Sequence, residues 1–389
     1  MGAISQKPRL LFVVGAYPPA DKEGGPGLMI KALSKYLHSH NCIIQVSTTN
    51  KNGNEKLAFN NETIEDSYAE VFYGDYNRPL LPYHSMPMIK HTAAVMNNVD
   101  FVFISSSWNL YGVITGYLAR LKRKPYAVYS HGSYHPVRLE KSRLKKALWW
   151  FLFDKWLYKN AKFVIAMSEN ERLQVKSYGV DSEVIVLPIG IDNTLMESNY
   201  TNPDPNPPMV APGQKYILFL SRISEIKNLE YTFDYFADFL IANDLMLLVA
   251  GGGDPAYINE VERYLDNHIA KNHIKLLGVV SASEKRYLLE NAKFFTLLSK
   301  AEGLPQSVLE AMHFGVPVIA SNECNLLDAI ECGAVLRDSD NATLNIMADL
   351  LHNQEHYERL SKKTLVYAQE HFDWQSISIK YLEHINRNI

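Results

Sequence analysis

Short apolar runs alternate with stretches of helical periodicity through the first half of this 389-residue chain. Met29, Leu33 and Leu37 recur every four residues, which places them on one face of a helix. The apolar runs are short and show little polar alternation, a pattern typical of parallel strands that helices cover on both faces. Strands are predicted at residues 10–14, 43–46, 101–104, 126–129, 163–166 and 184–187.

The same alternation returns in the second half, after a stretch that fits neither pattern. Residues 199–213 hold five prolines and little that could pack, which is a linker composition. After it, strands are predicted at residues 216–220, 245–250, 274–277, 294–298 and 317–320. We therefore expect an α/β protein of two doubly wound Rossmann-like domains facing a central cleft, with the carboxyl ends of the strands at that cleft.

The predicted domain division follows from this linker. Residues 1–195 form the N-terminal domain, 196–213 the linker and 214–370 the C-terminal domain. Residues 371–389 are expected to form a C-terminal helix that can cross back to the N-terminal domain.

Composition and charge narrow the classes of function. A hydrophobic fraction of 47% with 21% charged residues is ordinary for a globular chain and excludes a disordered or collagen-like protein. The net charge of −3 provides no general attraction to nucleic acid, so no such partner is expected. The three cysteines are scattered and fit a reducing compartment, so the expected location is cytoplasmic.

The segment at residues 299–320 holds the clearest candidate for anion binding. A helix is predicted to begin at Pro305, because proline suits a first helical position. The free amides of Gln306 and Ser307 would then lie at the positive end of the helix dipole, where a phosphate binds.

Two carboxylates flank this predicted phosphate site along the chain. Glu302 precedes the helix and Glu310 lies inside it. With a diphosphate at the helix start, one could bind sugar hydroxyls and the other ribose hydroxyls. The alternative is that both are solvated charges beside an ordinary strand–helix turn.

A pair of cations follows the first strand of the second half. Arg222 and Lys227 lie on the loop after that strand, at the same expected sheet edge as the helix start. Guanidinium and ammonium groups both bind phosphate oxygens. The alternative is a surface ion pair with Glu225 or Glu230.

The first half offers weaker candidates. Gly24 and Gly25 would let the backbone approach an anionic ligand, although tight turns use such glycines too. Gly15 is not followed by the further glycines of a dinucleotide-binding fingerprint, which counts against a nicotinamide oxidoreductase. His131 ends a predicted strand and could contact a ligand, or could be structural.

These residues form a pattern seen in a known family. Glu302 and Glu310 enclose seven residues and are followed by Ala311-Met312 and by Gly315-Val316-Pro317-Val318. This segment resembles the retaining GT-B glycosyltransferases of family 4. Further elements fall in the order of that family, namely Gly24-Gly25, His131-Gly132, residues 188–192, Arg222 with Lys227, and Gly251-Gly252-Gly253.

The resemblance implies a role for each residue. Arg222 and Lys227 would bind the donor diphosphate, while Glu310 would contact the ribose. Glu302 would contact the transferred sugar and His131 one of its hydroxyls, and these two are the catalytic candidates. The remaining donor-binding candidates are Gly24, Gly25, Gly303, Leu304, Pro305, Gln306 and Ser307. Pro305 stands where many relatives have glycine, so one amide donor is missing.

The expected function is transfer of a sugar from a nucleoside-diphosphate donor with retained anomeric configuration, in polysaccharide, lipopolysaccharide or glycolipid assembly. No cofactor and no metal is expected, because cations and a helix terminus can stabilise the leaving phosphate. Asp338-Ser339-Asp340 matches a metal-binding DxD, but more simply caps a helix near Asn341. An epimerase or hydrolase on the same scaffold, and a non-catalytic nucleotide-sugar-binding subunit, remain alternatives.

Residues 138–162 are both basic and aromatic. They hold eight basic and two acidic residues, together with Trp149, Trp150 and Trp156. Such a stretch is typical of a peripheral contact with anionic lipid, which would place the protein at the inner face of the membrane and favour a lipid-linked acceptor. The alternative is a half-buried helix with a solvated basic face.

Overall fold

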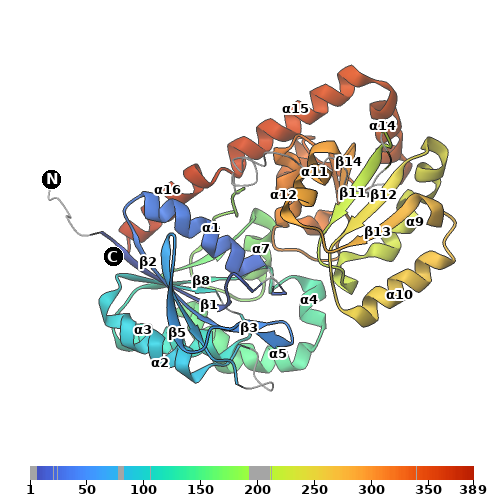
Figure 1. Ribbon diagram of the computed structural model, residues 1–389. Coiled ribbons are helices and arrows are strands. Elements are labelled where there is room, and N and C mark those ends of the chain that lie inside the picture. Colours follow the sequence, from blue (N-terminus) through green and yellow to red (C-terminus); the bar gives the residue numbers. More distant parts are fainter. Residues whose placement is uncertain are drawn as a thin grey trace. The chain divides into compact units, whose positions relative to one another are not determined.

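The computed structural model describes residues 7–20, 22–23, 25–77, 83–105, 107–191, 211, 213–338 and 340–389. The chain divides into two compact units (Figure 1). The first comprises Met1–Gly190 with Trp374–Ile389, and the second Ile191–Asp373. Most of the predicted linker, and Gly24, lie outside the described residues.

The first unit is built on a mostly parallel sheet. Among the described residues eight strands form it, in the order β10-β9-β8-β7-β1-β2-β6-β5, and β5 alone of them runs antiparallel, against β6. All six predicted strands are present, whereas β5 and β6 were not predicted. The strands of the unit, including a small hairpin of β3 and β4, are β1 (Arg9–Ala16), β2 (Ile43–Thr49), β3 (Lys51–Asn52), β4 (Glu55–Lys56), β5 (Glu62–Asp66), β6 (Ala69–Gly74), β7 (Phe101–Ser105), β8 (Tyr126–Tyr129), β9 (Phe163–Ala166) and β10 (Val184–Val186).

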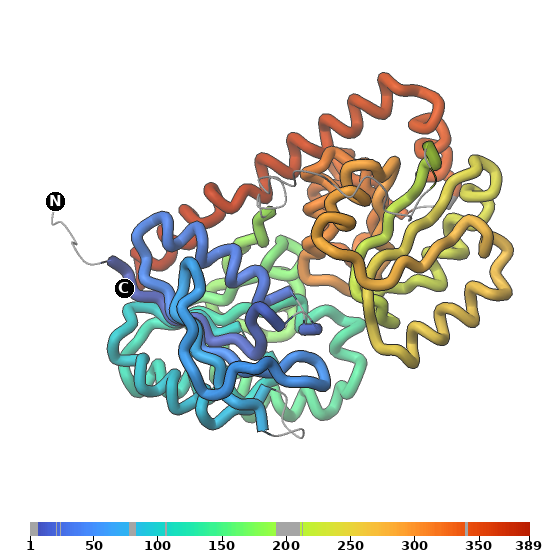
Figure 2. Tube along the Cα trace, in the orientation of Figure 1, coloured from blue at the N-terminus to red at the C-terminus, as the bar shows by residue number. Residues whose placement is uncertain are grey.

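Helices connect these strands and cover the sheet. They are α1 (Gly25–Ser39), α2 (Met86–Val95), the 3₁₀ turn η1 (Met96–Asn98), α3 (Leu110–Leu121), α4 (Pro136–Glu140), α5 (Arg143–Trp149), the π-helical turn η2 (Trp150–Asp154), α6 (Lys155–Lys159), α7 (Glu169–Ser177) and α16 (Trp374–Asn386). Helix α16 comes from the end of the chain, and Figure 2 shows it beside α1, on which it packs. Its Trp374 fills the space that a side chain at Gly190 would need.

The second unit is doubly wound as well. Among the described residues its parallel sheet has the order β13-β12-β11-β14-β15-β16. The order reverses between β11 and β14, and in open α/β sheets such a switch point is where ligands bind. Its strands are β11 (Tyr216–Leu220), β12 (Met246–Ala250), β13 (Ile274–Gly278), β14 (Phe294–Leu297), β15 (Val318–Ala320) and β16 (Leu336–Arg337). The five predicted strands are confirmed, and the short β16 was not predicted.

The helices of the second unit are α9 (Leu229–Asn243), α10 (Pro255–Asp266), α11 (Ala282–Asn291), α12 (Gln306–His313), α13 (Leu327–Glu331), α14 (Asp340–His352) and α15 (Gln354–His371), with 3₁₀ turns η3 (Glu225–Lys227), η4 (Lys271–His273) and η5 (Asn322–Cys324). Ser281 and Glu284 form a reciprocal capping box at α11, as their spacing predicts. Within the described part of the chain, none of the helices has the length and apolar character that crossing a bilayer requires.

Candidate functional site

The candidate site of the second unit lies at the switch point of its sheet. Residues 221–228 follow β11 and residues 298–305 follow β14, and these two strands are neighbours. The Lys300 amide donates to the Ile226 carbonyl at 2.8 Å, and the Asn228 side-chain amide donates to the Leu298 carbonyl at 3.2 Å. The two loops are therefore tied together, as their place at one sheet edge predicts.

A buried ion pair joins the two loops. Lys227 Nζ lies 2.5 Å from Glu302 Oε1, and the Glu302 residue is only 7% exposed. The alternative of a surface pair with Glu225 or Glu230 is wrong for this lysine, and the Glu230 carboxylate instead accepts from the Tyr257 hydroxyl. A charge pair with little access to water interacts far more strongly than an exposed one.

Helix α12 begins one residue later than predicted. Pro305 is its N-cap residue, with an extended backbone, and Gln306 is the first helical residue. Proline fits here because its fixed φ is also compatible with extended backbone. The amides of Gln306 and Ser307 make no hydrogen bond with a described residue, so two donors stay available at the positive end of the helix.

Asn325 fixes the loop that carries Glu302, a role that the sequence analysis missed. Its side-chain amide donates to the carbonyls of Glu302 at 2.8 Å and Gly303 at 2.7 Å. The Glu302 amide donates to the Glu323 carbonyl at 2.9 Å. The loop is thereby held against the residues after β15, with its shape fixed before any ligand binds.

Glu310 pairs with a lysine that the sequence analysis also missed. The Glu310 residue is 2% exposed, and its carboxylate lies 2.7 Å from Lys285 Nζ on α11. The Gln306 side-chain amide, one helical turn earlier, donates to Glu310 at 3.3 Å. Glu310 is therefore a buried, paired carboxylate, so the alternative of a solvated charge is wrong for it, as it is for Glu302.

Arg222 stands on a loop that a glycine run supports. The Ile223 amide donates to the Gly252 carbonyl at 2.7 Å. A Cβ atom at Gly251 would lie 1.9 Å from the Ser221 carbonyl oxygen, and one at Gly253 2.1 Å from the Ile223 carbonyl oxygen. Only glycine permits so close an approach of two backbones. Arg222 itself is exposed and forms no ion pair with a described residue.

In the first unit, His131 lies where β8 ends. Its Nε2 shares a hydrogen bond with the Ser105 hydroxyl at 2.6 Å, at the end of the neighbouring strand β7. Burial, and next the nearby Arg138 guanidinium, lower the pKa of His131 to about 3. The imidazole is therefore neutral at pH 7, so it can donate or accept a hydrogen bond with a hydroxyl but does not act as a general acid.

A buried carboxylate holds the loop around His131. Glu171 has no solvent exposure and accepts hydrogen bonds from the Ser130 hydroxyl at 2.6 Å, from the Met167 amide at 2.7 Å and from the Gly132 amide. His131 has φ of 48°, a conformation that is uncommon for residues other than glycine. Bonds on both sides of His131 offset that strain. Glu171 also lies in the first turn of α7, where its amide donates to the Ser168 hydroxyl and caps the helix.

The glycines before α1 differ in their surroundings. Gly25 is the first residue of α1, with open space where a Cβ would lie, so the protein itself does not require glycine there. Gly27, which was not singled out, would place a Cβ 2.4 Å from the Ala16 carbonyl oxygen. Nearby Glu23 is tied down by the Tyr83 hydroxyl at 2.6 Å and the Gly53 amide at 2.9 Å.

Among the described residues no group of histidine, cysteine, aspartate or glutamate could hold a metal ion.

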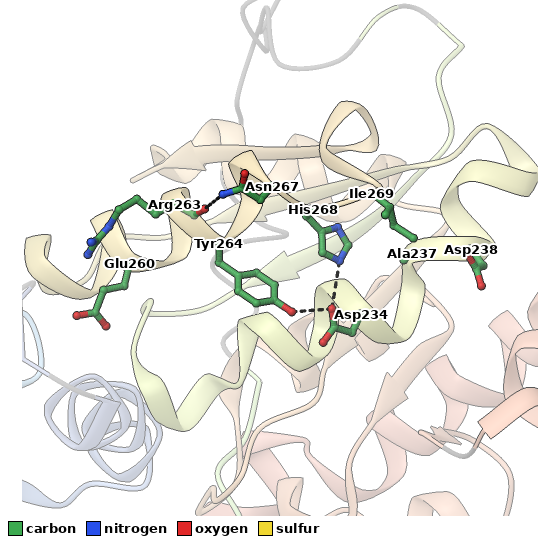
Figure 3. Close-up of a pocket in the computed structure, with 9 residues that line it drawn as sticks. All are labelled: Asp234, Ala237, Asp238, Glu260, Arg263, Tyr264, Asn267, His268 and Ile269. Atoms are coloured by element: carbon green, nitrogen blue, oxygen red, sulfur yellow. Dashed lines mark hydrogen bonds and ion pairs between the residues drawn. The ribbon is translucent and has the colours of Figure 1, made fainter.

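A hollow of about 790 Å³ lies between α9 and α10, apart from the candidate site (Figure 3). In it Asp234 accepts a hydrogen bond from the Tyr264 hydroxyl at 2.7 Å and shares one with His268 at 3.2 Å. It contains none of the predicted site residues.

Both halves of the chain match known sequence families. Residues 23–195 match the family described as Glycosyltransferase Family 4, and residues 204–365 match that described as Glycosyl transferases group 1. Together the two matches span most of the chain. The chain therefore belongs to family 4 of the glycosyltransferases.

Individual relatives agree with this assignment. The chain is 31% identical to the alpha-monoglucosyldiacylglycerol synthase of Streptococcus pneumoniae over 162 residues, which is 40% of this chain and only 36% of that protein. Sucrose-phosphate synthase from Thermosynechococcus elongatus has a TM-score of 0.75 at 17% identity, covering 98% of this chain and 99% of that one. Anabaena HepE in complex with UDP-glucose has a TM-score of 0.72 at 15% identity, covering 97% and 99%. The fold is thus GT-B.

Proposed function

We propose that this chain transfers a sugar from a nucleoside-diphosphate donor to an acceptor hydroxyl, with retention of the anomeric configuration. The observation that carries the proposal is the buried pair of Lys227 and Glu302 beside the free amides of α12, in a chain of family 4. A cation, a carboxylate and an anion-binding helix start are the groups that a sugar diphosphate needs.

Each group has a role in this proposal. Arg222 and Lys227 bind the diphosphate together with the amides of Gln306 and Ser307. Glu302 binds hydroxyls of the transferred sugar, and Glu310 binds the ribose. On the first unit, neutral His131 hydrogen-bonds a sugar hydroxyl, and Gly25 leaves room for the donor to approach the backbone.

Breaking the bond between the sugar and the diphosphate develops negative charge on the phosphate. Lys227, which its pair with Glu302 holds in place, acts with the exposed Arg222 and the N-terminus of α12 to stabilise that charge without a metal. We therefore propose transfer that requires no divalent cation and no cofactor. An epimerase or hydrolase on the same scaffold, and a non-catalytic donor-binding subunit, are the competing functions.

The acceptor that we propose is a lipid-linked sugar or a glycolipid, used at the cytoplasmic face of a membrane. The support is the relative from Streptococcus pneumoniae, whose name describes synthesis of a glucosylated diacylglycerol. HepE binds UDP-glucose, which supports a nucleotide sugar as donor. The segment at residues 138–162 is the proposed site of membrane contact.

The test begins with donor identity. A thermal-shift panel of UDP-, GDP-, ADP- and dTDP-sugars selects the donor, which is then incubated with extracted lipid acceptors with and without EDTA. We expect a product whose anomeric configuration by NMR equals that of the donor, formed equally with EDTA. Glu302→Gln should reduce transfer about 10² to 10³-fold, while the exposed Glu355→Gln on α15 leaves it unchanged. Conversion of the donor without an acceptor would favour the epimerase or hydrolase, and donor binding without any reaction would favour the binding subunit.

A further inference from the structure

One face of the helical segment from Arg143 to Lys159 exposes large apolar side chains. Helix α5, the π-helical turn η2 and α6 follow one another without a break, and α5 lies at the lower edge of the first unit in Figure 1. Four side chains on this segment are largely exposed: Leu144 (85%), Leu148 (60%), Phe151 (74%) and Leu152 (53%). Their spacings of three and four residues place them on one face.

The tryptophans, in contrast, are not the exposed aromatics that the sequence suggested. Trp150 packs against Tyr178 with ring centroids 5.2 Å apart, and Trp156 stacks on Tyr117 at 3.9 Å. The Trp149 ring nitrogen donates to the buried Asp154 at 2.9 Å. Trp150 and Trp156 therefore anchor the segment to the first unit, while Trp149 bonds within the segment. The leucines and Phe151 remain exposed and available for contact with a membrane or another molecule.

Exposed cations lie next to the exposed apolar side chains along the helix, since Lys145 precedes Leu148 by three residues and Lys155 follows Leu152 by three. Lys145, Lys155 and Lys159 are exposed on the same segment. Its one aspartate, Asp154, is buried, and burial raises the pKa of this carboxyl to about 6. The outward charge of the face is therefore purely positive. We call Leu144, Leu148, Phe151 and Leu152 with these three lysines the basic apolar face.

We propose that the basic apolar face docks on an anionic lipid bilayer, with its leucines and Phe151 inserted at the level of the headgroups. Lysines beside inserted apolar side chains meet the negative headgroups, so both parts of the face gain on binding. A second copy of the chain fits less well, because a twofold contact through this face would set lysine against lysine. Membrane docking rests on the proposed function in one respect, because a lipid-linked acceptor gives the docking its purpose. Vesicle binding itself can be measured without any sugar transfer.

The test is co-sedimentation of the full chain with phosphatidylcholine vesicles that contain either none or about 30% phosphatidylglycerol. We expect binding to the anionic vesicles, weakened as salt rises from about 0.05 to 0.5 M. The double substitution Leu148→Ser with Phe151→Ser should weaken binding by at least about a hundredfold. The matched control is Leu173→Ser with Ile379→Ser, which removes two exposed apolar side chains elsewhere on the same unit and should bind as the parent does.

The lysines are tested separately. Lys145→Gln with Lys155→Gln should weaken binding about 25-fold, because each charge contributes roughly fivefold near such a surface. The control pair Lys362→Gln with Lys380→Gln changes the net charge equally and should have no effect. Equal binding to both vesicle types, or loss of binding with the control pairs as well, would overturn the proposal. The proposal would also be overturned if the chain binds no vesicles and forms a dimer in light scattering that Leu148→Ser with Phe151→Ser dissociates. Retained vesicle binding without any sugar transfer would reject the enzyme proposal alone.

Discussion

Replacing Lys227 by methionine tests the central pair of the site. The substitution keeps the length of the side chain but removes the ammonium 2.5 Å from Glu302. Glu302 is 7% exposed, so its carboxylate stays largely out of water without a partner. Breaking a buried pair in this way costs about 3 kcal/mol or somewhat more.

This loss of stability can be measured as a fall in melting temperature, Tm. For a unit of this size, 1 kcal/mol shifts Tm by about 2–4 °C, so Lys227→Met should lower Tm of the second unit by about 6–12 °C in calorimetry. Adding Glu302→Gln removes the stranded charge and should restore much of that loss. Lys362→Met, at an exposed position of α15, serves as control and should change Tm little.

The same variant separates a structural from a functional role. If Lys227 binds the leaving diphosphate, kcat/KM of Lys227→Met should fall about 10² to 10³-fold at a temperature well below its lowered Tm, where the variant is folded. A Tm within about 1 °C of the parent would refute the reasoning on the buried pair. Parental kcat/KM in the folded Lys227→Met variant at that temperature would refute the role in phosphate binding.

Three further predictions concern other parts of the chain. Glu171→Gln leaves two backbone amides with one acceptor oxygen and should cost the first unit about 3 kcal/mol in urea unfolding, whereas no loss would show that the loop does not depend on this carboxylate. Ionised Asp154 costs the folded state about 3 kcal/mol, because burial raises its pKa to about 6. That cost is absent below pH of about 4 and develops as the pH rises to about 6, so Asp154→Asn should flatten the fall of Tm across this window, and an unchanged slope would contradict it. Gly251→Ala would bring a Cβ within 1.9 Å of the Ser221 carbonyl oxygen and should abolish the thermal shift produced by the donor, and an undiminished shift would argue against this loop as part of the site.

The fold was largely predictable from the sequence, for physical reasons. Buried parallel strands must be continuously apolar, and 11 such runs were recognised and are present. Strand β5, of sequence ETIED, escaped recognition because it is an edge strand with mostly exposed side chains. Its neighbour β6 escaped with it, although it pairs in parallel with β2.

Only those residues of the site that directly follow a predicted strand could be located from the sequence. Glu302, Lys227 and the start of α12 come directly after apolar strands, so their common edge could be inferred. Lys285 and Asn325 reach the site through contacts between separate elements, and nothing in their local sequence announces these contacts. For residues 138–162 the sequence indicated the wrong exposed side chains. Composition shows that tryptophans and leucines are present, but it does not show that the tryptophans pack against the first unit while the leucines are exposed.

The return of α16 to the first unit has a consequence for biosynthesis. Trp374, Ile377, Tyr381 and Ile385 are buried, and Tyr381 lies against Tyr129 of strand β8. A nascent chain has none of these side chains until the second unit has already been synthesised. Although most of the first unit is synthesised first, the apolar surface that α16 covers therefore stays exposed until the ribosome has synthesised the second unit. We expect the chaperone dependence of the nascent chain to fall once α16 has been synthesised.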